Sequence, residues 1–307
     1  MDQLSFLRQL DRVADACRRV GLARLPPAGK RLLKPFMQTG VSVTVNGLEV
    51  NASIEHRHYL TALRMGEVES FMNKLFASVI RPGMIVFDIG AFVGWYTLLA
   101  ARQVGSDGKV YAFEPDRRNY ALLTENLWRN KLHERVVAVP KAVSAGAGAS
   151  SFFLHGGDQS RSSLFPSDPQ AKKIVVDTVA LDDYFGAAMT AEVIKMDIEG
   201  GEMRALNGME RLLTRANRRV NLFIECNPQS LRLAGDSGPA LVARLRGLGF
   251  ALFIIDEANC SLAPLDSRIE SAKYVNLYCT REPGMEVRAI RTQRSHDRAE
   301  LSGDGSN

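Results

Sequence analysis

Apolar positions along the chain repeat alternately at the spacing of strands and at the spacing of helices. An apolar run at 84–88 is followed by helical spacing at 96–100, and the segments 109–113 and 116–130 repeat this order. Further strand patterns lie at 135–143, 151–154, 173–179, 193–197, 220–225, 250–255 and 273–280, and helical patterns at 181–185, between 202 and 215, and at 238–248. Such alternation predicts an α/β fold, in which a mostly parallel sheet is covered by helices on both faces.

The N-terminal part of the chain has a different pattern. A helical stripe over 3–20 ends before Pro26-Pro27, and alternating residues on both sides of Asn46-Gly47 predict a β-hairpin, because both turn residues tolerate positive φ. An amphipathic helix is expected over 66–80. We therefore predict three parts, which are a helix and hairpin cap (1–65), the main domain (66–282) and a disordered tail (283–307).

Composition limits the function classes. Apolar residues make up 46% of the chain and charged residues 24%, as in soluble globular proteins, and no apolar run is long enough to span a membrane. Residues 1–40 carry eight basic side chains against three acidic ones, which accounts for the net charge of +5. This basic helix is suited to weak contact with a membrane surface or an acidic partner, although a solvated face is the simpler interpretation. We expect a cytoplasmic protein without a nucleic-acid partner.

A turn rich in glycine follows the first strand of the main domain and predicts a nucleoside cofactor site. Asp88, Gly90 and Gly94 frame this turn, and a second strand ends in Glu114, whose carboxylate is suited to the two hydroxyls of a ribose. Phe92 stands where a dinucleotide fold needs its second glycine, so pyrophosphate has little room. An acidic Asp88 suits an amine or a sulfonium, both of which S-adenosyl-L-methionine carries. The candidate cofactor-binding residues are Asp88, Gly90, Ala91, Gly94, Tyr96, Thr97, Glu114 and Ala142.

Acidic residues recur where predicted strands end. Asp88, Glu114, Asp197 and Glu225 each close an apolar run. Ligands of open α/β sheets bind at the carboxyl ends of the strands. We therefore expect these four carboxylates to converge on one site.

Four motifs resemble, in order, the FkbM family of S-adenosylmethionine-dependent methyltransferases. They occupy 86–97, 112–115, 179–183 and 194–202, and the last one, with its Lys-x-Asp-x-Glu-Gly-x-Glu pattern, is the most specific to the family. The resemblance covers about residues 66–280. It implies a Rossmann-like class I methyltransferase fold with a seven-stranded sheet, S-adenosyl-L-methionine as cofactor, and O-methylation of a hydroxyl of a sugar, a glycan or a natural product. Phe92 departs from the family, which commonly has asparagine there.

The candidate catalytic residues are Lys195, Asp197 and Glu199, which share one face while the strand lasts. Asp197 or Glu199 would take the proton of the acceptor hydroxyl or orient it. In the alternative interpretation, Asp197 holds the cofactor's amine and Glu199 caps the next helix. Asp197, Glu225 and Asn227 also offer oxygen ligands suited to magnesium, but their spacing is not diagnostic, and we predict no metal.

Two other function classes stay open at this stage. An NAD-linked oxidoreductase is disfavoured by Phe92 and by the lack of an evident catalytic Tyr-Lys or His-Asp pair. A non-catalytic cofactor-binding module would keep the same turn and Glu114. The acceptor itself is not identified by any motif, and we expect the N-terminal cap and the 144–180 insertion to build its pocket.

Overall fold

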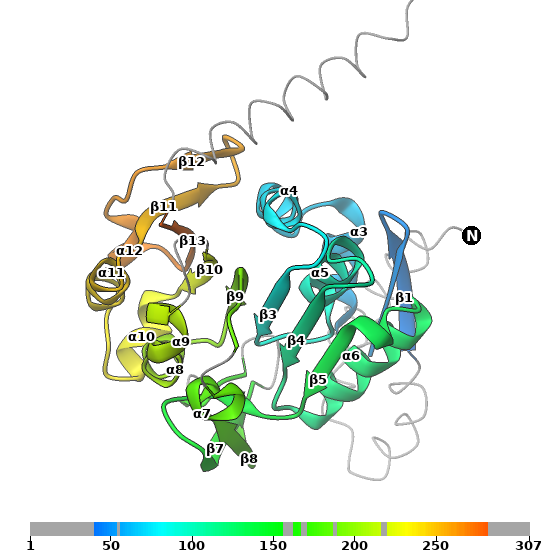
Figure 1. The fold of residues 1–307 in the computed structure, drawn as a ribbon, viewed down its shortest axis with the longest axis horizontal. Helices are drawn as coiled ribbons and strands as arrows, with labels where there is room; N and C mark the ends of the chain where they lie inside the picture. Colours follow the sequence, from blue (N-terminus) through cyan, green and yellow to red (C-terminus); the bar gives the residue numbers. More distant parts are fainter. Residues whose placement is uncertain are drawn as a thin grey trace, which may run out of the picture.

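An eight-stranded sheet forms the centre of the structure (Figure 1). The computed structural model describes residues 40–53, 56–155, 162–166, 171–186, 189–215 and 220–281. The strand order is β12-β11-β13-β10-β9-β3-β4-β5. These strands are β3 (Ile85–Ile89), β4 (Lys109–Phe113), β5 (Val136–Val139), β9 (Val193–Met196), β10 (Asn221–Cys226), β11 (Ala251–Asp256), β12 (Ser261–Ala263) and β13 (Val275–Thr280).

The order of the strands reverses once, between β3 and β9. From β3 the chain moves outward through β4 to β5, then returns to pair β9 with the other edge of β3, and β10 follows on that side. These five strands are parallel, whereas β13, β11 and β12 pair antiparallel. This is a Rossmann-like α/β sheet, and its ligand site is expected at the carboxyl ends of β3 and β9.

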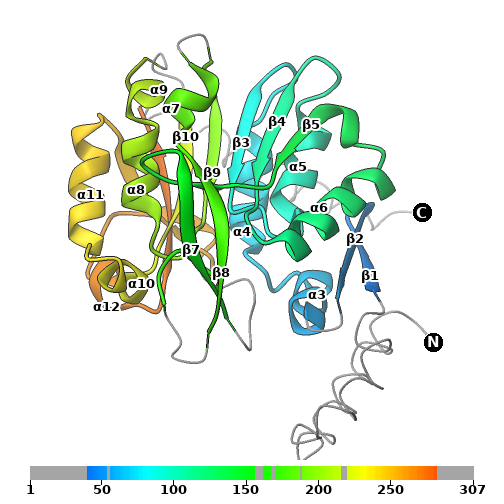
Figure 2. The ribbon, with the colours of Figure 1, turned by 90° about the horizontal axis from the view of Figure 1, so that it is seen from below.

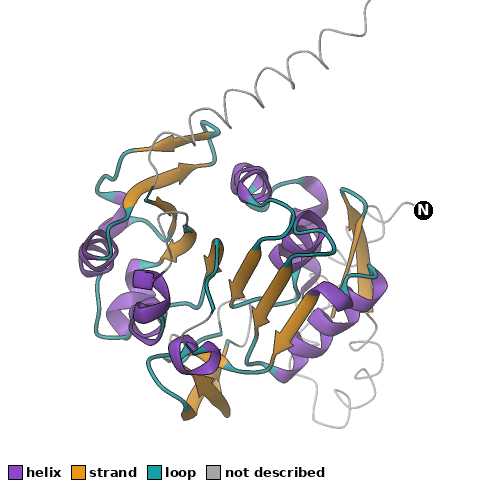
Figure 3. Ribbon diagram, viewed as in Figure 1, coloured by secondary structure: helices purple, strands orange, loops and turns teal. Residues whose placement is uncertain are grey.

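Helices cover both faces of the sheet (Figure 3), and a separate hydrophobic core lies between the sheet and the helices on each face. Along β3, Val86 faces one core and Phe87 and Ile89 face the other, as the two-residue period of a strand requires. The helices on the Val86 face are α4 (Ser70–Val79), α5 (Trp95–Gln103) and α6 (Arg117–Arg129). Those on the other face are α7 (Leu181–Phe185), α8 (Glu202–Gly208), α9 (Glu210–Arg215), α10 (Pro228–Leu233) and α11 (Gly238–Gly247).

The predicted hairpin is confirmed and packs beside α6 (Figure 1). It consists of β1 (Gly40–Val45) and β2 (Leu48–Ser53), joined by Asn46 and Gly47, which both have positive φ. The buried Asn126 of α6 accepts a hydrogen bond from the Asn51 N–H and donates to the carbonyls of Asn51 and Val93. One amide therefore ties the hairpin to the glycine turn after β3.

A separate three-stranded sheet lies over the carboxyl side of the main sheet and appears in front of it in Figure 2. It contains β6 (Ala142–Val143), β7 (Gly148–Leu154) and β8 (Lys172–Val179), and β8 lies between the other two strands. The predicted strand 135–143 is divided at Pro140 between the two sheets. This is the expected consequence of a residue that cannot donate to a ladder.

Several elements differ from the sequence prediction. The sheet has eight strands instead of seven, because the three-residue β12 pairs with β11 at the edge. The helix predicted between 202 and 215 is divided into α8 and α9. Helices α3 (Arg57–Met65) and α12 (Arg268–Ser271), the 3-10 turn His133–Arg135, and α10 after Asn227 were not predicted.

The predicted helix over 3–20 and the tail 283–307 lie outside the described residues, and the division at residue 65 stays a prediction. None of the helices described is long and apolar enough to cross a membrane.

Candidate functional site

Four adjacent strands bring one residue each to the same level at the carboxyl edge of the sheet. The last paired residues are Phe113 of β4, Ile89 of β3, Met196 of β9 and Ile224 of β10. The residues one step further are Glu114, Gly90, Asp197 and Glu225, which thus form a row across the switch point. The structure therefore brings Glu114, Asp197 and Glu225 to the same edge of the sheet.

The fourth predicted carboxylate, Asp88, lies elsewhere. It is fully buried inside β3, where it accepts a 2.5 Å hydrogen bond from the Thr97 hydroxyl, and its Oδ1 has no hydrogen-bond partner among the described residues. Asp88 lies two residues before Gly90 of the row, on the face of the sheet that α5 covers, so it does not reach the level of the other three carboxylates. Burial raises the pKa of Asp88, and Thr97 and the nearby Lys195 oppose this rise.

The glycine turn leaves no room for side chains at Gly90. This residue has φ +85°, and a Cβ built on it would lie 1.9 Å from the carbonyl oxygen of Asp197. Phe92 also has positive φ, at 52°, a conformation that asparagine adopts more readily. Its ring packs edge-on against His56 and Tyr59, and therefore forms a wall between the turn and the N-terminal elements.

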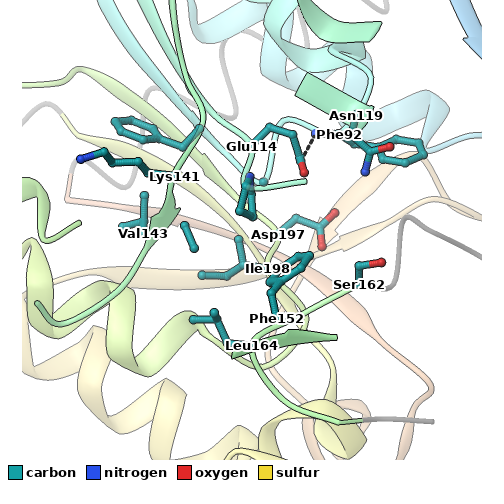
Figure 4. Close-up of a pocket in the computed structure, with 14 residues that line it drawn as sticks. Phe92, Glu114, Asn119, Lys141, Val143, Phe152, Ser162, Leu164, Asp197 and Ile198 are labelled. Carbon is teal, nitrogen blue, oxygen red and sulfur yellow. Dashed lines mark hydrogen bonds between the residues drawn. The ribbon is translucent and has the colours of Figure 1, made fainter. Parts of the chain in front are cut away.

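A mainly apolar cavity, here the Glu114 cavity, opens beside the row (Figure 4). Glu114, Asp197, Ile198 and Phe152 surround the same space in this view. Its lining residues are Gly90, Phe92, Phe113, Glu114, Pro115, Asn119, Lys141, Ala142, Val143, Phe152, Ser162, Leu164, Asp197 and Ile198. The insertion, through Phe152, Ser162 and Leu164, thus closes this cavity.

Both oxygens of Glu114 are held by main-chain N–H groups. Oε2 accepts a hydrogen bond from the Phe92 N–H at 2.8 Å, and Oε1 accepts one from the Asp116 N–H at 2.9 Å. Each oxygen keeps a further lone pair for a ligand hydroxyl. Burial raises the pKa of Glu114 to about 8, although these two hydrogen bonds oppose the rise.

This pKa predicts how stability depends on pH. Unfolding returns the Glu114 carboxyl group to its ordinary value of 4.5, so between pH 4.5 and about 8 the folded chain binds the extra proton. The free energy of unfolding should therefore fall as the pH rises through this window. We expect Glu114→Gln to reduce the fall by up to ~1.4 kcal/mol per pH unit, as measured by urea denaturation. Glu202, whose pKa burial also raises to about 8, would maintain part of the slope. An unchanged slope in the variant would contradict the raised pKa of Glu114.

A second, acidic cavity, here the Glu225 cavity, adjoins the first and shares Gly90, Phe92 and Asp197 with it. Its other lining residues are Tyr59, Glu67, Val68, Glu69, Ala91, Trp95, Tyr96, Lys195, Glu199, Glu225, Asn227, Lys273 and Tyr274. The two cavities therefore adjoin at these three residues, and one of them is mainly apolar whereas the other is rich in carboxylates.

Lys195 is the buried cation of the Glu225 cavity. Its Nζ lies 3.0 Å from Asp197 Oδ2 and 4.9 Å from the centre of the Tyr96 ring. Burial lowers the pKa of Lys195, but Asp197, Asp88 and Glu69 outweigh that effect and raise it overall. Lys195 is therefore charged, and it neutralises Asp197 in the resting protein.

Glu199 and Glu202 shape the turn after β9. Glu199 has φ 52° and accepts hydrogen bonds from the Asn227 amide at 2.9 Å and the Ser230 hydroxyl at 3.0 Å. It therefore braces the start of α10 instead of α8, the helix that follows it in the chain. Glu202 reaches back to accept from the N–H groups of Ile198 and Gly200.

Glu225 is the least engaged carboxylate of the row. It is 9% exposed, lines the Glu225 cavity, and makes no hydrogen bond or ion pair with the described residues. Burial raises the pKa of Glu225 well above its ordinary value, and Asp197, Glu199, Glu202 and Glu69 raise it further. A buried acid in this state is suited to exchange a proton with a ligand. Within the described residues, no three His, Cys, Asp or Glu side chains are arranged to hold a metal ion.

The structure separates the predicted cofactor-binding residues into two groups. Gly90, Ala91, Tyr96, Glu114 and Ala142 line the two cavities, whereas Asp88, Gly94 and Thr97 lie beneath the turn and do not line them. The candidate catalytic residues Lys195, Asp197 and Glu199 all line the Glu225 cavity. Sequence reasoning missed Glu69, Phe152 and Tyr274, which lie on elements without a recognisable motif.

Comparison with known proteins gives a family match over much of the chain. The model of the methyltransferase FkbM domain matches residues 88–252. The 31-O-demethyl-FK506 methyltransferase FkbM of Streptomyces tacrolimicus is 32% identical over 117 residues, which are 38% of this chain and 42% of that protein. The chain thus aligns with less than half the length of this relative.

Two solved structures show more distant likeness. A SAM-dependent O-methyltransferase of Thermotoga maritima is 17% identical, with a TM-score of 0.39, over 70% of this chain and 64% of the other. A SAM-dependent methyltransferase of Aquifex aeolicus is 15% identical, with a TM-score of 0.42, over 71% of this chain and 93% of the other.

Proposed function

Because the chain belongs to the FkbM methyltransferase family, we propose that it transfers the methyl group of S-adenosyl-L-methionine to an acceptor hydroxyl. The acceptor is a hydroxyl of a sugar, a glycan or a natural product. The observation that carries the proposal is the pair of joined cavities at the switch point, one apolar beside Glu114 and one lined by carboxylates.

The residues present fit this cofactor. Glu114 offers free lone pairs to a ribose diol beside an apolar space that suits adenine. The Glu225 cavity carries five carboxylates against two lysines, so it suits the positively charged sulfonium and amino group. Gly90 lines both cavities, and a side chain on it would collide with the carbonyl oxygen of Asp197.

When bound, the cofactor supplies a methyl group on a sulfonium, which is a good leaving group. The chain's own task is to align the acceptor, exclude water and receive a proton from the hydroxyl. Asp197, paired with Lys195, lies at the junction of the two cavities and would orient the acceptor hydroxyl. Glu199 holds Asn227 and Ser230 in place, so its role is to position that wall of the cavity.

Glu225 is the carboxylate with the capacity to accept the proton. Asp197 is neutralised by Lys195, and Glu199 already accepts two hydrogen bonds, whereas Glu225 is next to Asp197 in the row and has no such partner. The ionised form of a carboxyl group with a raised pKa is a stronger base than an ordinary carboxylate.

Isotopically labelled S-adenosyl-L-methionine provides the test. The purified chain is incubated with panels of glycans and polyketide-type alcohols, and the products are analysed by mass spectrometry. We expect label on an oxygen of one acceptor class. Label on nitrogen only, or no transfer to any acceptor by a chain that binds the cofactor, would contradict the proposal.

A further inference from the structure

Glu69 lies outside the family-matched segment 88–252, yet it is fixed tightly at the wall of the Glu225 cavity. Its Oε2 accepts a 2.6 Å hydrogen bond from the Tyr96 hydroxyl, and its Oε1 accepts one from the Asn276 amide. Tyr96 belongs to α5, which follows the glycine turn, and Asn276 belongs to β13. The backbone of Glu69 has φ 44°, a strained conformation for this residue type. Two distant elements therefore hold this carboxylate in place.

The buried charges around Glu69 do not balance. Among the described residues that line the cavity, Lys195 is the only buried lysine, and it faces Asp197, Asp88 and Glu69 together. Lys273, the other lysine of the cavity, is exposed at its rim. Glu225, buried and without a partner among the described residues, adds a further acid that opens into the same space. The cavity thus holds more acidic side chains than buried basic ones, and a cationic ligand would stabilise the ionised forms of these acids.

Burial raises the pKa of Glu69, and Asp197 raises it further, while Lys195, Tyr96 and Asn276 oppose the rise. A ligand cation next to this carboxylate would favour its ionised form. Each oxygen of Glu69 accepts one hydrogen bond and keeps a free lone pair, which suits the N–H donors of an ammonium group. A sulfonium has no such donor.

We propose that Glu69 binds the amino group of the amino-acid portion of S-adenosyl-L-methionine and is thereby a cofactor-binding residue. The inference rests on the proposed function, which places the nucleoside beside Glu114 and the amino-acid portion in the Glu225 cavity. Tyr96 and Asn276 are positioning residues that aim the Glu69 carboxylate.

Two ligands separate this role from a purely structural one. S-Adenosylhomocysteine carries the amino-acid portion, and 5′-methylthioadenosine lacks it. By isothermal titration calorimetry, we expect Glu69→Gln to weaken S-adenosylhomocysteine binding by about tenfold or more and to leave 5′-methylthioadenosine binding unchanged. Glu134→Gln is the control, because Glu134 is an exposed glutamate that lines neither cavity, and it should leave both affinities unchanged.

A third ligand tests the wild-type chain without any substitution. S-Adenosylhomocysteine lacking its amino group should bind wild type about tenfold more weakly than the parent compound, and Glu69→Gln should no longer distinguish the two. The inference would be overturned if wild type bound S-adenosylhomocysteine and its analogue without the amino group equally well. It would also be overturned if Glu69→Gln lost affinity for all three ligands to the same extent. If wild type binds S-adenosylhomocysteine and Glu69→Gln binds it equally well, this inference is contradicted, but the proposed function is not. Wild type that binds none of the ligands contradicts the proposed function as well.

Discussion

Replacing Gly90 with alanine is expected to reduce the free energy of unfolding by about 3 kcal/mol or more and to abolish cofactor binding. The new Cβ would lie 1.9 Å from the Asp197 carbonyl oxygen, which is main chain and so cannot rotate away as a side chain could. The Asp197 N–H donates to Ile89 at 3.0 Å, so a shift of this segment would also break the pairing of β3 with β9. Urea denaturation measures the first effect, and calorimetry with S-adenosylhomocysteine measures the second.

Gly47→Ala is the matched control for this substitution. Gly47 also has positive φ, at 77°, but a Cβ there would meet nothing within 4 Å. Its substitution should therefore cost only the backbone strain, about 1 kcal/mol, and should leave cofactor affinity unchanged. If the two variants were equally stable, the close contact between Gly90 and Asp197 would not be what requires glycine in the turn.

Glu225→Gln is expected to reduce turnover by a factor of about 10² to 10⁴ while the affinity for S-adenosylhomocysteine changes little. Glutamine has nearly the same size and can still form hydrogen bonds, but it cannot accept the proton of an acceptor hydroxyl. The measurement is the rate of labelled methyl transfer to whichever acceptor the panel identifies. Glu134→Gln makes the same chemical change at an exposed position outside both cavities and should keep the wild-type rate.

Two results would assign the proton to another group. If Glu225→Gln kept the wild-type rate while Asp197→Asn lost it, Asp197 would be the proton acceptor. If Glu199→Gln gave the largest loss, Glu199 would act on the acceptor in addition to bracing Asn227 and Ser230.

The sequence predicted the main sheet well because its strands are buried runs separated by strong turn signals. Glu114, Asp197 and Glu225 follow such runs directly, and the parallel register then places them in one row. Asp88 was misplaced because strand β3 continues to Ile89, one residue beyond it. Gly90 therefore stands in the row, and Asp88, two residues earlier, lies on the same face of the sheet but deeper inside it.

The walls of the site could not be predicted in the same way. Glu69 reaches the cavity only because Tyr96 and Asn276 hold it, and Asn276 is 207 residues away in the sequence. The insertion was expected to help build the acceptor pocket, and its described residues Phe152 and Leu164 line the Glu114 cavity, where we propose that the nucleoside binds. Contacts of this kind depend on how separate sheets pack, and no local pattern in the sequence specifies that.

A crystal structure of the full chain with S-adenosylhomocysteine tests the central claim most directly. The account predicts that the ribose hydroxyls lie within hydrogen-bond distance of Glu114, and that the amino-acid portion lies in the Glu225 cavity. A ligand bound away from the Gly90 turn, or crystals that remain empty at saturating ligand, would contradict it.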